Sequence, residues 1–352
     1  MKRLGEKLTR ATIQRFVRAP KLVIEGVFGA PPTNDRDAAL DHQVHALLGI
    51  MGATYNPSLD ELGPEKAREA YALSSRLFDV RPRRLRSTAD ERAKGPAGPV
   101  PVRIYRPNHH ADAPAIVYFH GGGFVVGDIE AYDGFCSRLA ELTDCVVVSV
   151  DYRLAPEHPF PAAIDDCVAA FEWVHDHAAR LGLDRERLAV AGDSAGGNLA
   201  AVVCQQLLER GGPMPSHQVL IYPTTDNRGG YRSMELFAEG YYLESSLVHW
   251  FSRTYLQDHD DMSDHRVSPV VYDRLGELPP AHIVTAGFDP LRDKGERYAR
   301  EMESAGARVR HHSYDQLVHG FVTMGGVIDA ADQAVVHLAA QLERGGIGGP
   351  RR

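Results

Sequence analysis

The stretch AVAGDSAGGNLA, residues 189–200, decides which fold this chain adopts. Ser194 lies midway between Gly192 and Gly196, after an apolar run and before an Ala-rich run. Chance gives this G-x-S-x-G spacing in about one chain in seven of this composition, and a helix-capping serine is the plain alternative. A strand before Ser194 and a helix after it would instead form a sharp turn whose small neighbours lift the hydroxyl clear of the backbone. The flanking segments therefore decide between a cap and a nucleophile.

Strand and helix patterns alternate along the chain from about residue 100. Apolar, β-branched runs predict strands at 100–105, 115–120, 145–152, 187–194, 217–223, 281–290 and 307–315, and helical patterns cover 36–52, 64–78, 161–182, 195–212 and about 331–344. Such alternation predicts an α/β protein with a mostly parallel central sheet flanked by helices. Ligands of these sheets bind at the carboxyl ends of the strands, and Ser194 stands at one of those ends.

An aromatic-rich segment at 225–265 interrupts this alternation. Its aromatic residues are Tyr231, Phe237, Tyr241, Tyr242, Trp250, Phe251 and Tyr255. On an isolated surface helix such side chains would favour aggregation, so we expect them to pack over the strand ends and against the N-terminal helices. Part of this apolar surface should then roof a pocket above Ser194.

A serine needs a base to become a good nucleophile, and three histidines fall in the right part of the chain. His311 and His312 lie inside the predicted strand at 307–315, where neighbouring side chains point to opposite faces of the sheet. His319 follows that strand on a loop, at the carboxyl edge where Ser194 also lies. We therefore predict His319 as the base.

The base in turn needs an acid that fixes its tautomer and stabilises the imidazolium. Asp289 directly follows the run AHIVTAGF, residues 281–288, near the end of a predicted strand, and so reaches the same edge of the sheet. Asp293 lies four residues further on and is its competitor, although a role in supporting the loop or capping a helix suits it better. With Asp289 as the acid, the chain order is Ser, Asp, His, which is the order in α/β-hydrolases.

The stretch FHGGGFVVG, residues 119–127, places three glycines after a strand. Glycines let backbone N–H groups approach a developing oxyanion closely, so Gly121, Gly122 and Gly123, together with the N–H of Ala195, are the predicted oxyanion hole. H-G-G-G arises by chance in about one chain in seventy of this composition. A phosphate-binding loop would need G-x-x-x-x-G-K-[ST] or G-x-G-x-x-G, and neither follows.

Composition excludes several classes of protein. The 352 residues carry a net charge of −8, which does not suggest nucleic-acid binding. No apolar run approaches the length of a transmembrane helix, and the basic N-terminus lacks the apolar core of a signal peptide. The four cysteines lie in apolar runs without C-x-x-C spacing and are expected to be buried free thiols: Cys136, Cys145, Cys167 and Cys204. A reducing, cytoplasmic location fits them.

The sequence resembles the bacterial hormone-sensitive-lipase-like carboxylesterases. The stretches that carry the resemblance span about residues 65–345 and are HGGGFVVGDIEAYD, DYRLAPEHPFPAAIDD, GDSAGGNLA, AEGYYLESSLVHWFSRTYL, FDPLRDKGERYARE and VHGF. The resemblance implies an α/β-hydrolase fold with a helical cap, in which Ser194, Asp289 and His319 are nucleophile, acid and base. It also implies that Gly122 and Gly123, the second and third glycines of the loop, donate to the oxyanion together with the Ala195 N–H. It further implies that residues 1–95 contribute to the cap, that 96–224 and 266–352 form the catalytic core, and that 225–265 are the cap insertion. Members often form homodimers through an edge strand.

The function expected is that of a serine carboxylesterase that hydrolyses short-to-medium acyl esters without a metal or an organic cofactor. An amidase or deacetylase with the same triad is the near alternative, because both reactions pass through one kind of tetrahedral intermediate. A non-catalytic ligand receptor on this fold is the distant one, and receptors of that kind lack an intact triad. Two further polar features have structural interpretations: Arg153 and Glu157 are expected to pair and hold the loop after a strand, and Asp193 to bind local backbone.

Overall fold

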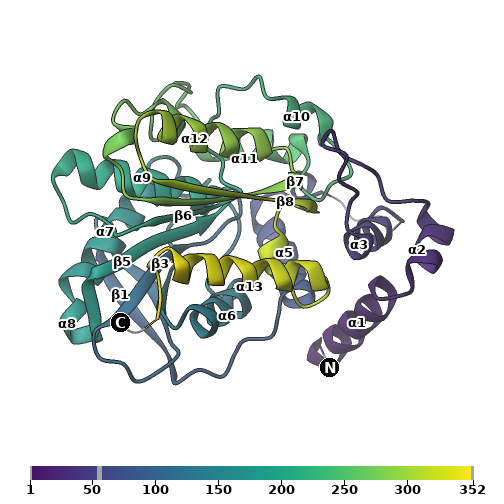
Figure 1. Ribbon diagram of the computed structural model, residues 1–352, viewed down its shortest axis with the longest axis horizontal. Coiled ribbons are helices and arrows are strands. Elements are labelled where there is room, and N and C mark those ends of the chain that lie inside the picture. The colour runs from purple at the N-terminus through teal and green to yellow at the C-terminus, as the bar shows by residue number, and fades with distance from the viewer. Residues whose placement is uncertain (1, 54–57, 350–352) are drawn as a thin grey trace.

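The computed structural model describes residues 2–53 and 58–349 and is built around one sheet (Figure 1). In this part of the chain eight strands pair in the order β1-β2-β4-β3-β5-β6-β7-β8. They are β1 (Ser87–Gly95), β2 (Gly98–Arg106), β3 (Ala113–Phe119), β4 (Val146–Val150), β5 (Leu183–Asp193), β6 (Gln218–Ile221), β7 (Ala281–Phe288) and β8 (Val309–Val318). β1 and β2 run antiparallel to their neighbours, and the other strands are mutually parallel. The predicted mostly parallel sheet is confirmed.

The central strands are apolar on both sides because helices cover both faces of the sheet. Every residue of β3 is buried, and its side chains alternate between two apolar cores. Val117 and Phe119 enter one core, whereas Ile116 and Tyr118 enter the other. This period of two explains why β3 appears in the sequence as a continuous apolar run.

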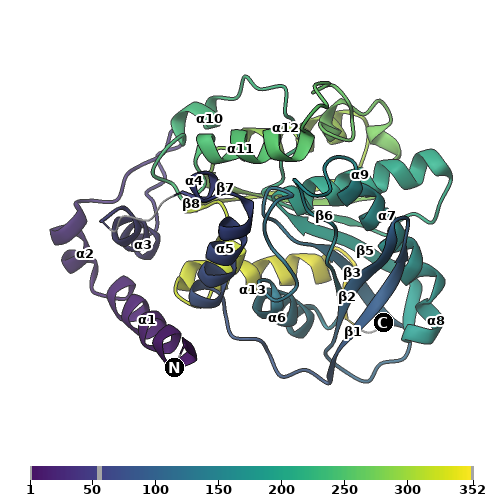
Figure 2. The same cartoon turned by 180° about the vertical axis from the view of Figure 1, so that it is seen from behind.

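The flanking helices divide between the two faces, and Figure 2 shows the same layers from behind. One face carries α6 (Asp133–Thr143) and α13 (Asp329–Arg344), and the other carries α7 (Ala162–Asp176), α9 (Ala195–Arg210) and α12 (Arg292–Ser304). The single helix predicted at 161–182 is two helices in the structure, because α7 ends at Asp176 and a short α8 (Ala178–Leu181) follows.

Two helical segments lie outside these layers. The first is N-terminal and contains α1 (Lys2–Val17), α2 (Lys21–Phe28), α3 (His42–Ala53), α4 (Leu59–Leu62) and α5 (Pro64–Phe78); the second contains α10 (Arg232–Leu236) and α11 (Ser245–Leu256). α3 begins later than the predicted helix 36–52 because the Asp41 carboxylate accepts the N–H groups of Gln43 and Val44 and so caps the helix there. Among the described residues, no helix combines the length and apolarity needed to cross a membrane.

Candidate active site

Ser194 occupies a sharp turn between β5 and α9. Its backbone adopts φ +55° and ψ −116°, a strained conformation for a residue with a side chain, and it is the only residue of 188–200 that is not buried. The close packing around it requires glycine. A Cβ on Gly196 would lie 1.9 Å from the Phe119 carbonyl oxygen, and one on Gly192 would lie 2.2 Å from the Gly196 oxygen. The strand–turn–helix context predicted for Ser194 is present.

The Ser194 hydroxyl begins a chain of two hydrogen bonds. Its Oγ lies 2.9 Å from Nε2 of His319, and Nδ1 of His319 lies 2.8 Å from Oδ2 of Asp289. A carboxylate can only accept, so Nδ1 carries the proton and Nε2 is left to accept from the serine. Asp289 is fully buried, and its other oxygen accepts the Leu291 N–H at 2.7 Å. This arrangement can remove a proton from the Ser194 hydroxyl.

Sheet register explains why residues so distant in sequence meet. Ser194, Asp289 and His319 directly follow β5, β7 and β8, which are parallel. Phe288 pairs with Val318 at the last position of β7 and β8, so the next residue of each strand lies beside the other. The three side chains therefore converge at one edge of the sheet.

The alternatives to these residues lie elsewhere. Asp293 accepts the Ser233 N–H at 2.9 Å and pairs with Arg292, so it supports α10. His311 bonds to Thr285 within the sheet through Nε2. The ring of His312 packs edge to face against the ring of His337 on α13. The structure brings Asp289 and His319, not these competitors, to Ser194.

The glycine loop follows β3 and turns toward Ser194. Gly122 and Gly123 have φ values of +118° and +59°, which side chains disfavour. In the part of the chain that the structure describes, the N–H groups of Gly122, Gly123 and Ala195 have no protein acceptor. The Gly121 N–H differs, because it donates to Oδ1 of Asp193 at 2.8 Å. The prediction of Gly121 as an oxyanion donor is therefore wrong: its N–H is already used inside the protein.

Asp193 holds the glycine loop through the Gly121 N–H. The expectation that Asp193 binds backbone near it in sequence is therefore wrong as well. Besides Gly121, its carboxylate accepts the hydroxyls of Tyr118 at 2.7 Å and Tyr132 at 2.9 Å. Tyr132 also bonds to the hydroxyl of Tyr71 on α5. Burial raises the pKa of Asp193, and these donors oppose that rise. The partners lie far away in sequence, which is why local reasoning missed them.

The loop after β4 is also held differently from the expectation. Arg153 forms a two-pronged ion pair with Asp166 at the start of α7, at 2.8 and 2.9 Å, and not with Glu157. Glu157 instead binds Arg68 of α5. The predicted Arg153–Glu157 pair is thus wrong, although both residues do hold this loop. Its contact with α5 ties the N-terminal segment to the core.

Aromatic side chains of the 225–265 segment pack on the loops that follow β3 and β8. A Cβ on Gly123 would lie 2.1 Å from the ring of Phe251, so this ring packs directly on the glycine loop. A Cβ on Gly320, the residue after His319, would lie 3.0 Å from the ring of Tyr242. Tyr255 stacks on Phe124 with 3.9 Å between ring centroids. None of the segment's seven aromatic residues is exposed, as the expectation of packing over the strand ends requires.

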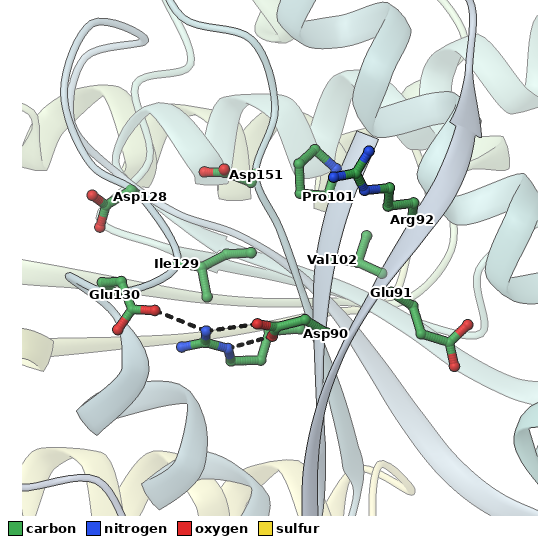
Figure 3. A pocket seen from close by; sticks show the side chains of 10 residues that line it. Asp90, Glu91, Arg92, Pro101, Val102, Asp128, Ile129, Glu130 and Asp151 are labelled. Carbon is green, nitrogen blue, oxygen red and sulfur yellow. Dashed lines mark hydrogen bonds and ion pairs between the residues drawn. The ribbon is translucent and has the colours of Figure 1, made fainter. Parts of the chain in front are cut away.

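A cavity of about 420 Å³ lies elsewhere, against β1 and β2 (Figure 3). Its lining is acidic overall, with five carboxylates against two arginines, and Arg103 bridges Asp90 and Glu130. Asp151 lines it as well, and burial raises the pKa of that carboxyl. Ser194, Asp289 and His319 do not line it. Within the described residues, no cluster of three or more His, Cys, Asp or Glu could hold a metal ion.

Fold and site together define a serine hydrolase with the α/β-hydrolase fold. A family model described as alpha/beta hydrolase fold matches residues 116–323. Carboxylic ester hydrolase LipN of Mycobacterium tuberculosis is 45% identical over 71% of this chain and 69% of its own length, and ethyl acetate hydrolase of Pseudomonas putida is 39% identical over 70% and 78%. The solved ester hydrolase EH1AB1 from the Lake Arreo metagenome superposes with a TM-score of 0.85 at 40% identity, covering 87% of this chain and 99% of that one. The chain belongs to the hormone-sensitive-lipase-like carboxylesterase family and is a carboxylic ester hydrolase.

Proposed function

We propose that Ser194, His319 and Asp289 are the catalytic triad of this carboxylesterase. The observation that carries the proposal is the chain of hydrogen bonds at 2.9 and 2.8 Å, set on a strained turn at the sheet edge. Ser194 Oγ attacks the acyl carbonyl while Nε2 of His319 takes its proton. The same nitrogen then protonates the leaving alcohol. Water attacks the acyl-enzyme with His319 again as base, and Asp289 stabilises the imidazolium in both steps.

The oxyanion of the tetrahedral intermediate is held by the N–H groups of Gly122, Gly123 and Ala195. Gly122 and Gly123 can turn their N–H groups toward the carbonyl because both adopt positive φ. Ala195 is the first residue of α9, where backbone N–H groups are free and the helix dipole favours negative charge. Losing one such donor typically costs about 10²–10³ in kcat.

The proposed substrates are esters of short-to-medium acyl chains. Residues 225–265 and the N-terminal segment 1–95 act as the cap over the core formed by 96–224 and 266–352. Phe251, packed on Gly123, limits the space beside the reacting carbonyl. One relative is named for ethyl acetate, which agrees with a small acyl group.

Covalent labelling tests the triad directly. A fluorophosphonate probe should add once, to the peptide that carries Ser194, and Ser194→Ala should abolish labelling and lower turnover about 10³-fold or more. The related EH1AB1 was solved in complex with a derivative of bipyridine phosphonate. Labelling of another residue, with activity retained in Ser194→Ala, would refute the assignment. A parallel panel of aryl esters with graded acyl length and one aryl amide decides between esterase and amidase.

A further inference from the structure

We propose that the N-terminal arm, defined as α1 and α2 (Lys2–Phe28), docks this enzyme on an anionic phospholipid surface. This interaction is separate from the proposed function and leaves the active site as described. Figures 1 and 2 both place α1 and α2 at one end of the molecule, beyond the helices that flank the sheet. Two independent features of this arm carry the inference: an exposed apolar face and a local excess of positive charge.

The apolar face belongs to α2. Leu22, Val23 and Val27 are 82%, 51% and 58% exposed, which makes them the three most exposed large apolar side chains of the described residues. Their exposure is not a consequence of a detached helix, because the opposite side of α2 is packed. Ile24 is buried, and Phe28 meets Phe16 of α1 edge to face at 5.9 Å. The helix thus presents a fixed apolar face to the surroundings.

The arm is attached to the body on its inner side. Gln14 of α1 donates to the Gly326 carbonyl at 2.7 Å, and Arg18 pairs with Asp329 at the start of α13, also at 2.7 Å. These contacts hold the arm on the body, so docking of α2 on a surface would bring the whole enzyme to that surface. Docking through Leu22, Val23 and Val27 needs no unfolding and no loss of these contacts.

The positive charge of the arm indicates which kind of partner covers the apolar face of α2. Residues 1–28 contain seven Lys or Arg and two Glu, a net charge of +5, whereas the remaining residues carry −13. Arg15 of α1 is exposed, and the Lys21 side chain, at the start of α2, is 66% exposed. Two copies meeting face to face through α2 would bring two such arms together, and like charges oppose this. An anionic lipid surface attracts the arm, accepts its apolar side chains and repels the acidic body, so it also orients the enzyme.

Vesicle co-sedimentation of the full chain tests the proposal. Vesicles of phosphatidylcholine with about one-third phosphatidylglycerol should bind the protein at least about tenfold better than pure phosphatidylcholine, and ~0.5 M salt should abolish the difference. The combined variant Leu22→Ser, Val23→Ser, Val27→Ser should lower binding about tenfold or more, because a contribution from each buried side chain is lost. Val336→Ser, at a side chain of α13 that is 40% exposed, is the matched control and should change nothing.

The melting temperature and the far-ultraviolet circular dichroism of each variant verify that it is folded, since all four side chains are exposed on the surface. The proposal fails if the wild-type chain stays in the supernatant with anionic vesicles, or if the triple variant binds as the wild type does. It also fails if sedimentation shows a wild-type dimer that the triple variant converts to a monomer, because the face would then join two copies of the chain.

Discussion

Replacing Asp289 by asparagine should separate the electrostatic role of this residue from its shape. The Leu291 N–H, 2.7 Å from Oδ1, keeps an acceptor only if the new amide turns its oxygen toward it. The amide NH₂ then occupies the position of Oδ2, 2.8 Å from Nδ1 of His319. Two donors cannot face each other there, so the imidazole must move its proton to Nε2. That proton would point at Ser194 Oγ, which leaves the serine without a base.

This wrong tautomer sets the magnitude of the effect. A change of this type lowers kcat by about 10⁴, which corresponds to about 5.4 kcal/mol of barrier at 1.36 kcal/mol for each factor of ten. The fold should survive, since the amide fills the same space and keeps two hydrogen bonds, one accepted from the Leu291 N–H and one donated to the unprotonated Nδ1 of His319. Asp293→Asn is the matched control: Asp293 binds Ser233 and Arg292 rather than His319, so its loss should act on stability and leave kcat within about tenfold of wild type.

The assay combines kcat for a soluble aryl butyrate with the melting temperature of each variant. Asp289→Asn should show the large loss in kcat with a melting temperature close to that of wild type. Retention of kcat within tenfold in folded Asp289→Asn would refute the tautomer argument. Equal losses in the two variants at equal melting temperatures would refute the choice of Asp289 over Asp293.

Three further outcomes are expected. His319→Ala should lose as much turnover as Ser194→Ala in the same ester assay, whereas His311→Ala should keep most of it; the reverse would overturn the base assignment. Efficiency should peak near butyryl or hexanoyl esters, and Phe251→Ala should move that peak to longer chains, since each added methylene buried gains about 0.8 kcal/mol; an unchanged profile would remove Phe251 from the pocket. Burial first, and then His217, lowers the pKa of His282 from 6.5 to about 4, so the unfolded chain alone takes up this proton as pH falls from 6.5 to 4. As pH falls from 6.5 to 4, the unfolding free energy of the wild type should therefore drop by up to about 3 kcal/mol more than that of His282→Gln. Chemical denaturation at each pH measures this difference, and parallel plots of unfolding free energy against pH for the two proteins would contradict it.

Much of the fold was predictable because the buried parallel strands can be recognised in the sequence. β3, β4 and β7 are buried on both faces, and this burial appears as continuous apolar runs that no other element explains. β1 was missed for the opposite reason. It is an edge strand whose sequence, STADERAKG, is polar and mostly exposed, and it is fixed by pairing with β2 rather than by burial. Edge strands of this kind leave little trace in a sequence.

The position of the site followed from the same logic, but its polar partners did not. Strand ends place Ser194, Asp289 and His319 at one edge of the sheet, so chain order and strand boundaries are enough to propose them together as the triad. Arg153 was assigned to Glu157, four residues away, yet it pairs with Asp166 on α7. Sequence proximity favours local pairs, whereas a folded chain offers each charge many distant partners, and only three-dimensional packing selects among them.

The two carboxylates next to the reaction centre illustrate how preorganisation is divided in this site. Asp289 fixes the imidazole on one side of Ser194, and Asp193 fixes the first glycine of the loop on the other. Both are buried, and both have their oxygens engaged by donors of the protein. Neither donor set needs to reorganise when charge moves from the serine to the carbonyl oxygen, so the cost of orienting these dipoles is met during folding. Tyr132 links Asp193 to Tyr71 on α5 through two hydrogen bonds, so the N-terminal segment also helps to hold the Asp193 carboxylate in place. Tyr71→Phe should therefore weaken binding of a transition-state analogue more than it weakens binding of the substrate, although Tyr71 touches neither.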